Sequence, residues 1–138
     1  MKKEEVLKFI KKHDLAVVAT VSVENKPQAS VVEFGELDDL AIIIDLLKTS
    51  RKYKNLQSNR NVAVVIGWDD NITVQMDGIA HELSGEELEK AKIAYFVKNP
   101  RAKKWANNPD IVYYVLKPYW IRYSDVTKHP WLIEEFSL

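Results

Sequence analysis

The most informative part of the sequence is a short run of hydroxyl and basic side chains at a predicted strand-to-helix junction. Thr49 and Ser50 follow a predicted strand, and Arg51, Lys52 and Lys54 fall in the first turn of the helix that comes next. The helix dipole makes each cation at this end unfavourable by roughly a few tenths of a kcal/mol. A bound anion would resolve the conflict, because free backbone amides, two hydroxyls, a guanidinium and an ammonium can together enclose a phosphate. The alternative is that these side chains extend into water and pair with nearby acids.

Few other residues fall in patterns that carry chemistry. The glycine motifs of dinucleotide-binding and P-loop folds are absent, and so is the G-x-S-x-G turn of serine hydrolases. The lack of cysteine excludes disulfides, thiolate nucleophiles and cysteine-based metal sites. His13, His81 and His129 are far apart in sequence, and Asp69-Asp70-Asn71 is typical of a hairpin turn rather than a calcium loop. We therefore predict no metal site and assign no catalytic residue.

The composition is that of an ordinary globular domain. Of the 138 residues, 46% are hydrophobic and 29% charged, so we expect residues 1–138 to form a single domain with its own core. The 20 basic and 20 acidic side chains give a net charge of zero, which argues against binding to nucleic acid or anionic lipid. The charged start of the chain is unlike a signal peptide, and Leu40–Ile44, the longest apolar run, is too short to span a membrane. We expect a cytoplasmic protein.

Hydrophobic periodicity predicts mostly strands. Residues 2–13 have the apolar spacing of a short amphipathic helix. Runs rich in β-branched residues and separated by turns are then predicted to be strands: Leu15–Val23, Gln28–Phe34, Leu40–Leu47, Asn61–Trp68, Ile72–Leu83, Ile111–Leu116 and Tyr119–Val126. Lys117-Pro118 is interpreted as a bend between the last two.

Further helices are predicted between these strands. The run R-K-Y-K-N-L-Q-S begins one after an amino-terminal cap at Thr49 or Ser50. Ser84 and Glu87 have the spacing of a capping box, which predicts a helix that runs to about Lys98, and residues 101–107 are expected to add another turn. The last stretch, H-P-W-L-I-E-E-F-S-L, carries apolar anchors that could dock on a neighbour.

These elements predict a mainly β fold with flanking helices, of the α+β class. The first five strands follow one another without a crossover helix between each pair, which favours a split antiparallel β-barrel over a parallel doubly wound sheet. Strands such as Ala41–Ile44 and Val62–Ile66 are apolar at consecutive positions and need cover on both faces. The barrel interior covers one face, and a helix or a second subunit must cover the other, which favours a homodimer.

The run L-L-K-T-S-R-K-Y-K-N-L, followed at once by the strand N-V-A-V-V-I-G-W, resembles the FMN-binding split-barrel family typified by pyridoxamine 5′-phosphate oxidase. The resemblance extends to the opening hairpin A-V-V-A-T-V-S-V-E-N-K-P-Q-A-S, to T-V-Q-M-D-G-I-A and to K-P-Y-W-I-R-Y-S-D. It implies a split barrel, non-covalent FMN, oxidoreductase chemistry and a homodimer with its cofactor sites at the interface.

The resemblance also implies roles for individual residues. Ser50, Arg51 and Lys52, with Thr49 before them, match the run that holds the flavin phosphate in the family. Asp45-Leu46 matches a strand end that contacts the ring and the ribityl chain. A further group matches the strand whose backbone follows the isoalloxazine edge: Gln28, Ala29, Ser30 and Val31.

Later positions match residues that the family places near the flavin. Thr73 and Gln75 fall near the place of a glutamine that often comes from the partner subunit, and Thr73 stands where the typical oxidase has that glutamine. Trp120 and Arg122 resemble a late aromatic and basic pair. Aromatic residues in paired strands are more often core or interface residues, and Trp105 carries no functional prediction.

The substrate stays open. The chain ends with two acids where the typical oxidase has a basic segment that binds the substrate phosphate. NAD(P)H or a small molecule is the candidate reaction partner. Three alternatives remain: a split barrel that holds a deazaflavin or haem, a non-enzymatic flavin-binding or stress-related protein, and a barrel without a cofactor that acts through protein contacts.

Overall fold

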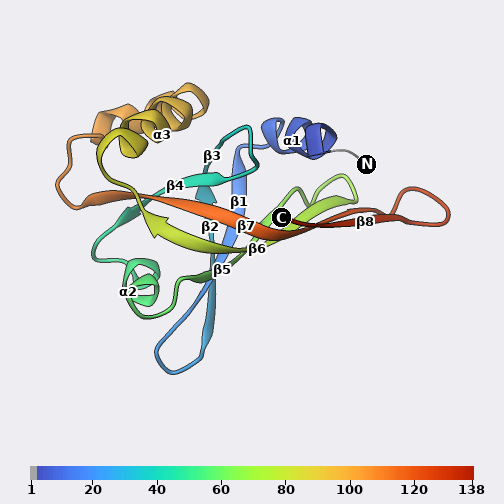
Figure 1. Ribbon diagram of the computed structural model, residues 1–138, viewed down its shortest axis with the longest axis horizontal. Coiled ribbons are helices and arrows are strands. Elements are labelled where there is room, and N and C mark those ends of the chain that lie inside the picture. Colours follow the sequence, from blue (N-terminus) through green and yellow to red (C-terminus); the bar gives the residue numbers. More distant parts are fainter. Residues whose placement is uncertain (1–2) are drawn as a thin grey trace.

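The computed structural model describes residues 3–138, which form a curled antiparallel sheet with helices against it (Figure 1). The helices are α1 (Lys3–Lys11), α2 (Arg51–Ser58) and α3 (Gly85–Lys98), and a 3₁₀ helix, η1 (Pro100–Trp105), follows α3. They agree with the predicted helices to within a few residues, and position 2 of the predicted first helix lies outside the described residues. None of the helices in the described chain is long and apolar enough to cross a membrane.

The sheet has eight strands in the described residues: β1 (Leu15–Val21), β2 (Pro27–Glu33), β3 (Gly35–Glu36), β4 (Ile42–Leu47), β5 (Asn61–Ile66), β6 (Ile72–Glu82), β7 (Ile111–Asp125) and β8 (Leu132–Ser137). Their order is β2-β1-β5-β6-β7-β4-β3, all neighbours are antiparallel, and β8 pairs with β7. The order places β2 at one end of the path and β4 next to the other end, and the curl of the sheet brings these two strands into contact. The predicted split antiparallel barrel is confirmed.

Two apolar clusters account for the burial of the consecutive apolar strands. The concave side of the sheet holds the larger one, with Val18, Ile42 and Ile44 almost fully buried. On the other face of β4, Ile43 packs with Tyr95 of α3 in the second cluster. In Figure 1, α3 accordingly lies on one side of β4 and β7, and α2 lies on the other. A helix therefore gives β4 the second cover that its sequence requires.

The outer face of β5 has no such cover. Val62, Val64 and Ile66 point into the core, but Ala63 is exposed and Val65 only half-buried. Strand pairing places Val17 of β1 beside Val65, on the same face. The main contacts of β5 are with its neighbouring strands β1 and β6, and α2 reaches β1 at the buried Thr20, on the inner face.

One prediction about the last third of the chain was wrong. Ile111–Leu116 and Tyr119–Val126 are one strand, β7, because the pairing shifts between Asp77 and Gly78. The shift sets Gly78 against Pro118, so that proline, which cannot donate an N–H, is accommodated at a bulge. The carboxy-terminal run forms β8, which pairs with β7 of the same chain from Leu132 to Ser137, and docking of its apolar anchors on a neighbour stays a prediction.

The capping box predicted at the start of α3 was also wrong. Ser84 is the residue before the helix, but its side chain makes no capping hydrogen bond. Gly85 follows with a φ of 62°, in the left-handed region that glycine tolerates. This backbone turn, rather than a serine cap, begins the helix.

Candidate functional site

Helix α2 begins on a capped turn that follows β4 directly. The Ser50 hydroxyl donates to the carbonyl of Leu47 at 2.7 Å and accepts from the amide of Tyr53 at 3.2 Å. The first amides of a helix have no partner within it, and this cap satisfies that of Tyr53. The amides of Arg51 and Lys52 remain at the helix start, and no acid lies in the first turn.

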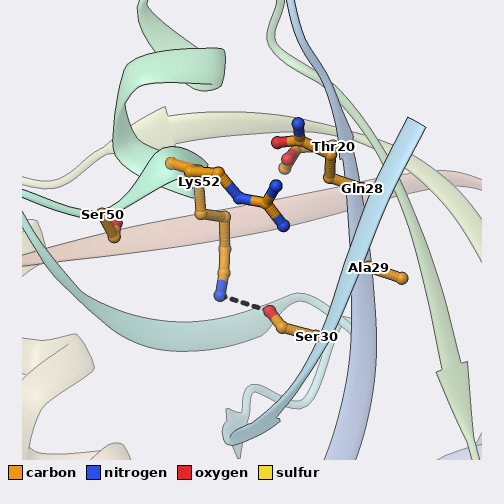
Figure 2. Close-up of a pocket in the computed structure, with 7 residues that line it drawn as sticks. Thr20, Gln28, Ala29, Ser30, Ser50 and Lys52 are labelled. Carbon is orange, nitrogen blue, oxygen red and sulfur yellow. Dashed lines mark hydrogen bonds between the residues drawn. The ribbon is translucent and has the colours of Figure 1, made fainter. Parts of the chain in front are cut away.

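A cavity of about 210 Å³ lies between this helix start and strand β2. Figure 2 shows Lys52 extending from α2 to Ser30, where its ammonium donates to the hydroxyl at 2.6 Å. The cavity is lined by residues from the start of α2 and from the paired strands β1 and β2: Thr20, Gln28, Ala29, Ser30, Ser50, Arg51 and Lys52. Two cations and three hydroxyl side chains thus line a space large enough for a phosphate group.

A buried amide fixes the far wall of this cavity. Asn55 of α2 donates to the hydroxyl of Thr20 and to the side-chain oxygen of Gln28, both at 2.9 Å. Asn55 and Thr20 are almost fully buried, where an unpaired polar group would be costly. The network ties α2 to β1 and β2, so the two sides of the cavity keep their spacing.

The ammonium of Lys52 is held where its charge is poorly solvated. Burial lowers the pKa of Lys52 below its ordinary value of 10.5, and the negative charge of Asp45 opposes this shift. A bound anion would stabilise the same ammonium. The electrostatics of the cavity therefore suit a negatively charged group.

A second cavity, of about 510 Å³, continues from the first and shares Ser50 and Lys52 with it. Val32, Leu46, Leu47 and Ile111 give it an apolar wall. Its remaining lining is polar or aromatic and comes from β2, β4, α3 and the segment after it: Glu33, Asp45, Tyr95, Trp105 and Asn108, with Val31 at the edge.

Asp45 is the centre of the polar side of this second cavity. The indole N–H of Trp105 donates to its carboxylate at 3.2 Å. Burial raises the pKa of the Tyr95 phenol far above its ordinary value of 10.0, and the charge of Asp45 and a hydrogen bond to it add to the shift. Tyr95 therefore stays protonated and acts as a donor to Asp45.

The structure gathers most of the predicted site residues around these two cavities. Six of them line the first: Gln28, Ala29, Ser30, Ser50, Arg51 and Lys52. Val31, Asp45 and Leu46 line the second. Thr49 is exposed and lines neither of them.

The other four predicted residues lie together elsewhere. Thr73 and Gln75 of β6 and Trp120 and Arg122 of β7 lie on the outer face of the sheet, where Gln75 is directly opposite Arg122. Arg122 also pairs with Glu135 of β8 at 2.7 Å. None of the four lines either cavity within one chain.

Sequence reasoning missed several residues of the two cavities. Thr20 and Asn55 carried no signal because single polar residues in a strand or helix are common. Tyr95 was not singled out and Trp105 carried no functional prediction, because nothing local indicates that they meet Asp45 across 50 and 60 positions of sequence. No group of His, Asp and Glu in residues 3–138 could hold a metal ion.

Comparisons with known proteins identify relatives of this chain. A pyridoxine/pyridoxamine 5′-phosphate oxidase of Microcystis aeruginosa is 30% identical over 95 residues, which are 66% of this chain and 42% of that protein. The second curated relative it matches is covered to 40%, so the chain spans about two-fifths of the length of these relatives.

Solved structures share the fold at lower identity. A haem-binding protein of Mycobacterium smegmatis superposes with a TM-score of 0.84 at 21% identity, covering 99% of this chain and 58% of that one. General stress protein 26 of Bacillus anthracis gives 0.77 at 24%, covering 99% and 98%. The sequence pattern of the pyridoxamine 5′-phosphate oxidase family matches residues 3–125. This chain therefore belongs to the pyridoxamine 5′-phosphate oxidase family.

Proposed function

We propose that the protein is an FMN-binding flavoprotein of this family and works as an oxidoreductase. The observation that carries the proposal is the acid-free, cationic start of α2, which opens on a cavity lined by Arg51, Lys52 and Ser50. These groups suit the terminal phosphate of a mononucleotide, because a guanidinium, an ammonium and helix-start amides all donate to phosphate oxygens. The fit rests on this donor set and on the lowered pKa of Lys52.

The chain's own residues would hold and orient the cofactor. Arg51 and Lys52 would bind the phosphate, and the edge of β2 at Gln28–Val31 would supply backbone hydrogen bonds to the ring. Bound FMN would supply the electron transfer, which no side chain of this protein performs. NAD(P)H or a small molecule is the proposed reaction partner.

We further propose that two copies form the working unit. The uncovered outer face of β1 and β5, with Val17, Val65 and Ala63, is the surface that a second copy would cover. Thr73 and Gln75 lie on the same side of the sheet on β6, which pairs with β5, and Trp120 and Arg122 lie next to them on β7. A dimer through this face would let one copy contribute these residues to the other copy's cofactor.

Haem is a weaker candidate for the same site. Protein ligands to haem iron are His, Cys, Met or Tyr side chains. Of these, the two cavities contain only Tyr95, whose hydroxyl is engaged with Asp45. The solved haem-binding protein shares the fold of this chain at 21% identity, and this likeness does not assign haem to the chain.

A spectrum and melting curves test the proposal. Purified protein incubated with FMN should show flavin absorbance, and FMN at 100 times its Kd should add about 2.7 kcal/mol of stability. Riboflavin, which lacks the phosphate, is the matched control and should stabilise the protein much less. Equal effects of the two ligands, or none, would contradict a phosphate site. Turnover with NADH or NADPH then separates an oxidoreductase from a flavin-binding protein without activity.

A further inference from the structure

The two connected cavities differ in charge. Arg51 and Lys52 line the first cavity, whose donors suit a phosphate. A phosphate held there leaves the rest of FMN to the second cavity, which is larger, at about 510 Å³, and offers an apolar wall to a flat ring. Two carboxylates line this second cavity, those of Asp45 and Glu33. The flavin would therefore span both cavities, with its phosphate beside cations and its ring beside acids.

Two uncharged donors fix the Asp45 carboxylate at the wall of the second cavity. The indole N–H of Trp105 donates to it at 3.2 Å, and the Tyr95 phenol donates to it as well. Burial raises the pKa of Tyr95, and the negative charges of Asp45 and Glu33 raise it further, so both acids act on the same point. Hydrogen bonds from neutral donors favour the charged form of a carboxylate. They hold the Asp45 side chain in place and leave its negative charge in the cavity.

No cation of residues 3–138 forms an ion pair with Asp45. Of the described residues that line the second cavity, only Lys52 is a cation, and its ammonium donates to Ser30, on the side of the first cavity. Glu36, a largely buried acid, is by contrast paired with Lys98 at 2.7 Å. A phosphate bound by Lys52 would take up the charge of that ammonium, so the carboxylate of Asp45 would stay uncompensated beside the ring.

We propose that Asp45, with a smaller contribution from Glu33, lowers the reduction potential of FMN bound across the two cavities. The inference rests on the proposed function and names how this chain would tune the cofactor. FMN takes up two electrons and one proton to give FMNH⁻, so the reduced ring carries a negative charge that the oxidised ring lacks. A carboxylate fixed in a half-buried position beside the ring disfavours this added charge. The protein would thus favour the passage of electrons from the reduced flavin to an acceptor.

The reduction potential of bound FMN tests this role. FMN-loaded protein is reduced with dithionite in the presence of a reference dye, and the absorbance of flavin and dye gives the potential. Asp45→Asn removes the charge and keeps an acceptor for Trp105. It should raise the potential by about 30 mV or more, which for two electrons is a tenfold change in the ratio of the affinities for oxidised and reduced FMN.

Two control variants separate the charge of Asp45 from its place in the fold. Asp45→Glu keeps the charge and should have a potential near that of the wild type. Asp38→Asn, at an exposed acid outside both cavities, should leave the potential unchanged. An unchanged or lower potential in Asp45→Asn would overturn the inference, and so would equal rises in Asp45→Asn and Asp45→Glu.

A second acid keeps the inference testable if Asp45→Asn does not fold. Glu33 lies at the exposed rim of the second cavity, where a substitution disturbs little packing. Glu33→Gln should raise the potential by a smaller amount than Asp45→Asn, because the charge of Glu33 is better screened by solvent. A potential that does not rise in Glu33→Gln would then count against the inference.

The proposed function and this inference fail in different ways. Titration of the wild-type protein with oxidised FMN reports on the proposed function alone. If FMN does not bind, both proposals fail. If FMN binds and the loss of the Asp45 charge does not raise its potential, only the present inference fails.

Discussion

Helices α2 and α3 both begin directly after a serine, yet their first turns differ in charge and in capping. The first turn of α3 carries Glu86 and Glu87, the acids that a helix dipole favours, although Ser84 makes no capping bond. The first turn of α2 carries Arg51 and Lys52 and no acid, and Ser50 does cap it. The dipole therefore stabilises one helix start and destabilises the other.

The difference separates a start built for stability from one suited to a ligand. Helix α3 packs its buried residues on the sheet, and its acids face solvent. The cations of α2 instead line a cavity together with the edge of β2. The Ser50 hydroxyl satisfies one free amide at this start, and no acid in the first turn of α2 pairs with its cations. The predictions below test that contrast, from the largest expected effect to the smallest.

Loss of the Arg51 guanidinium should have the largest effect. Arg51→Ala should weaken FMN binding by about 1.5–3 kcal/mol, the scale of a charge-assisted hydrogen bond. This equals roughly a ten- to hundredfold rise in Kd, measured by titration with flavin fluorescence. Arg101→Ala, at an exposed arginine in η1, is the control and should leave Kd unchanged. Unchanged affinity in Arg51→Ala would contradict the proposal that the start of α2 binds the FMN phosphate.

Alkaline pH should weaken FMN binding through Lys52. Its pKa lies below the ordinary 10.5 because of burial, so the ammonium that binds phosphate is lost at lower pH than on an exposed lysine. Affinity should fall as pH rises from about 7 toward about 10, and titrations across this range measure it. Lys52→Arg stays charged and should remove most of the decline. Identical profiles of the two proteins would contradict a role for this ammonium.

The stability of the ligand-free protein should change with pH in the opposite direction to the affinity for FMN. Between the folded pKa of Lys52 and the higher unfolded value, the unfolded chain binds more protons than the folded one. The contribution of Lys52 to stability therefore rises with pH over this window. Denaturant unfolding of wild type and Lys52→Met, compared at several pH values, isolates this contribution.

The two serines should differ in their contributions to stability. Ser50→Ala removes the bonds to Tyr53 and Leu47 and should cost about 1 kcal/mol, as typical caps do. Ser84→Ala removes no capping bond and should stay within about 0.5 kcal/mol of wild type. Denaturant unfolding of both variants gives the answer. Equal losses would show that the caps do not distinguish the two helices.

Charge reversal should give the smallest effect on the ligand-free protein. Arg51→Glu places an acid where the dipole favours it and should raise the stability of the ligand-free protein by about 0.3–1 kcal/mol. The same variant should lose stabilisation by FMN. Glu86→Arg in α3 is the mirror-image control and should lower stability by a similar amount without affecting FMN binding. A loss of stability in Arg51→Glu would mean that Arg51 serves the fold.

Much of the fold was predictable because its signals are local. The opening hairpin follows from two strand-like runs, the first rich in β-branched residues, on either side of a four-residue turn, and β1 pairs with β2 in register from Leu15–Glu33 to Val21–Pro27. The errors arose where residues distant in the sequence decide the local structure. Pro118 looked like a break until Gly78, on another strand, provided a bulge opposite it. The tail's docking to β7 depends on pairing, which its own sequence does not specify.

The candidate site also has a part that local sequence predicts and a part that depends on distant residues. Ser50, Arg51 and Lys52 are contiguous and lie at a helix start, so their chemistry was visible in sequence and the structure places them around one cavity. The second cavity combines Asp45 with residues of α3 and η1, and no spacing in the sequence indicates that these residues lie together. The role of all these residues in binding FMN remains a prediction.

A missing side chain sets how closely α3 approaches the sheet. A Cβ on Gly35 would come within 2.9 Å of the Cα of Tyr95, so only glycine lets the helix backbone rest on β3 at this depth. Tyr95 in turn donates to Asp45. The hydrogen bond between Tyr95 and Asp45 in the second cavity therefore depends on a position that lines neither cavity: Gly35→Ala would push α3 away from β3 and move the Tyr95 phenol away from the Asp45 carboxylate.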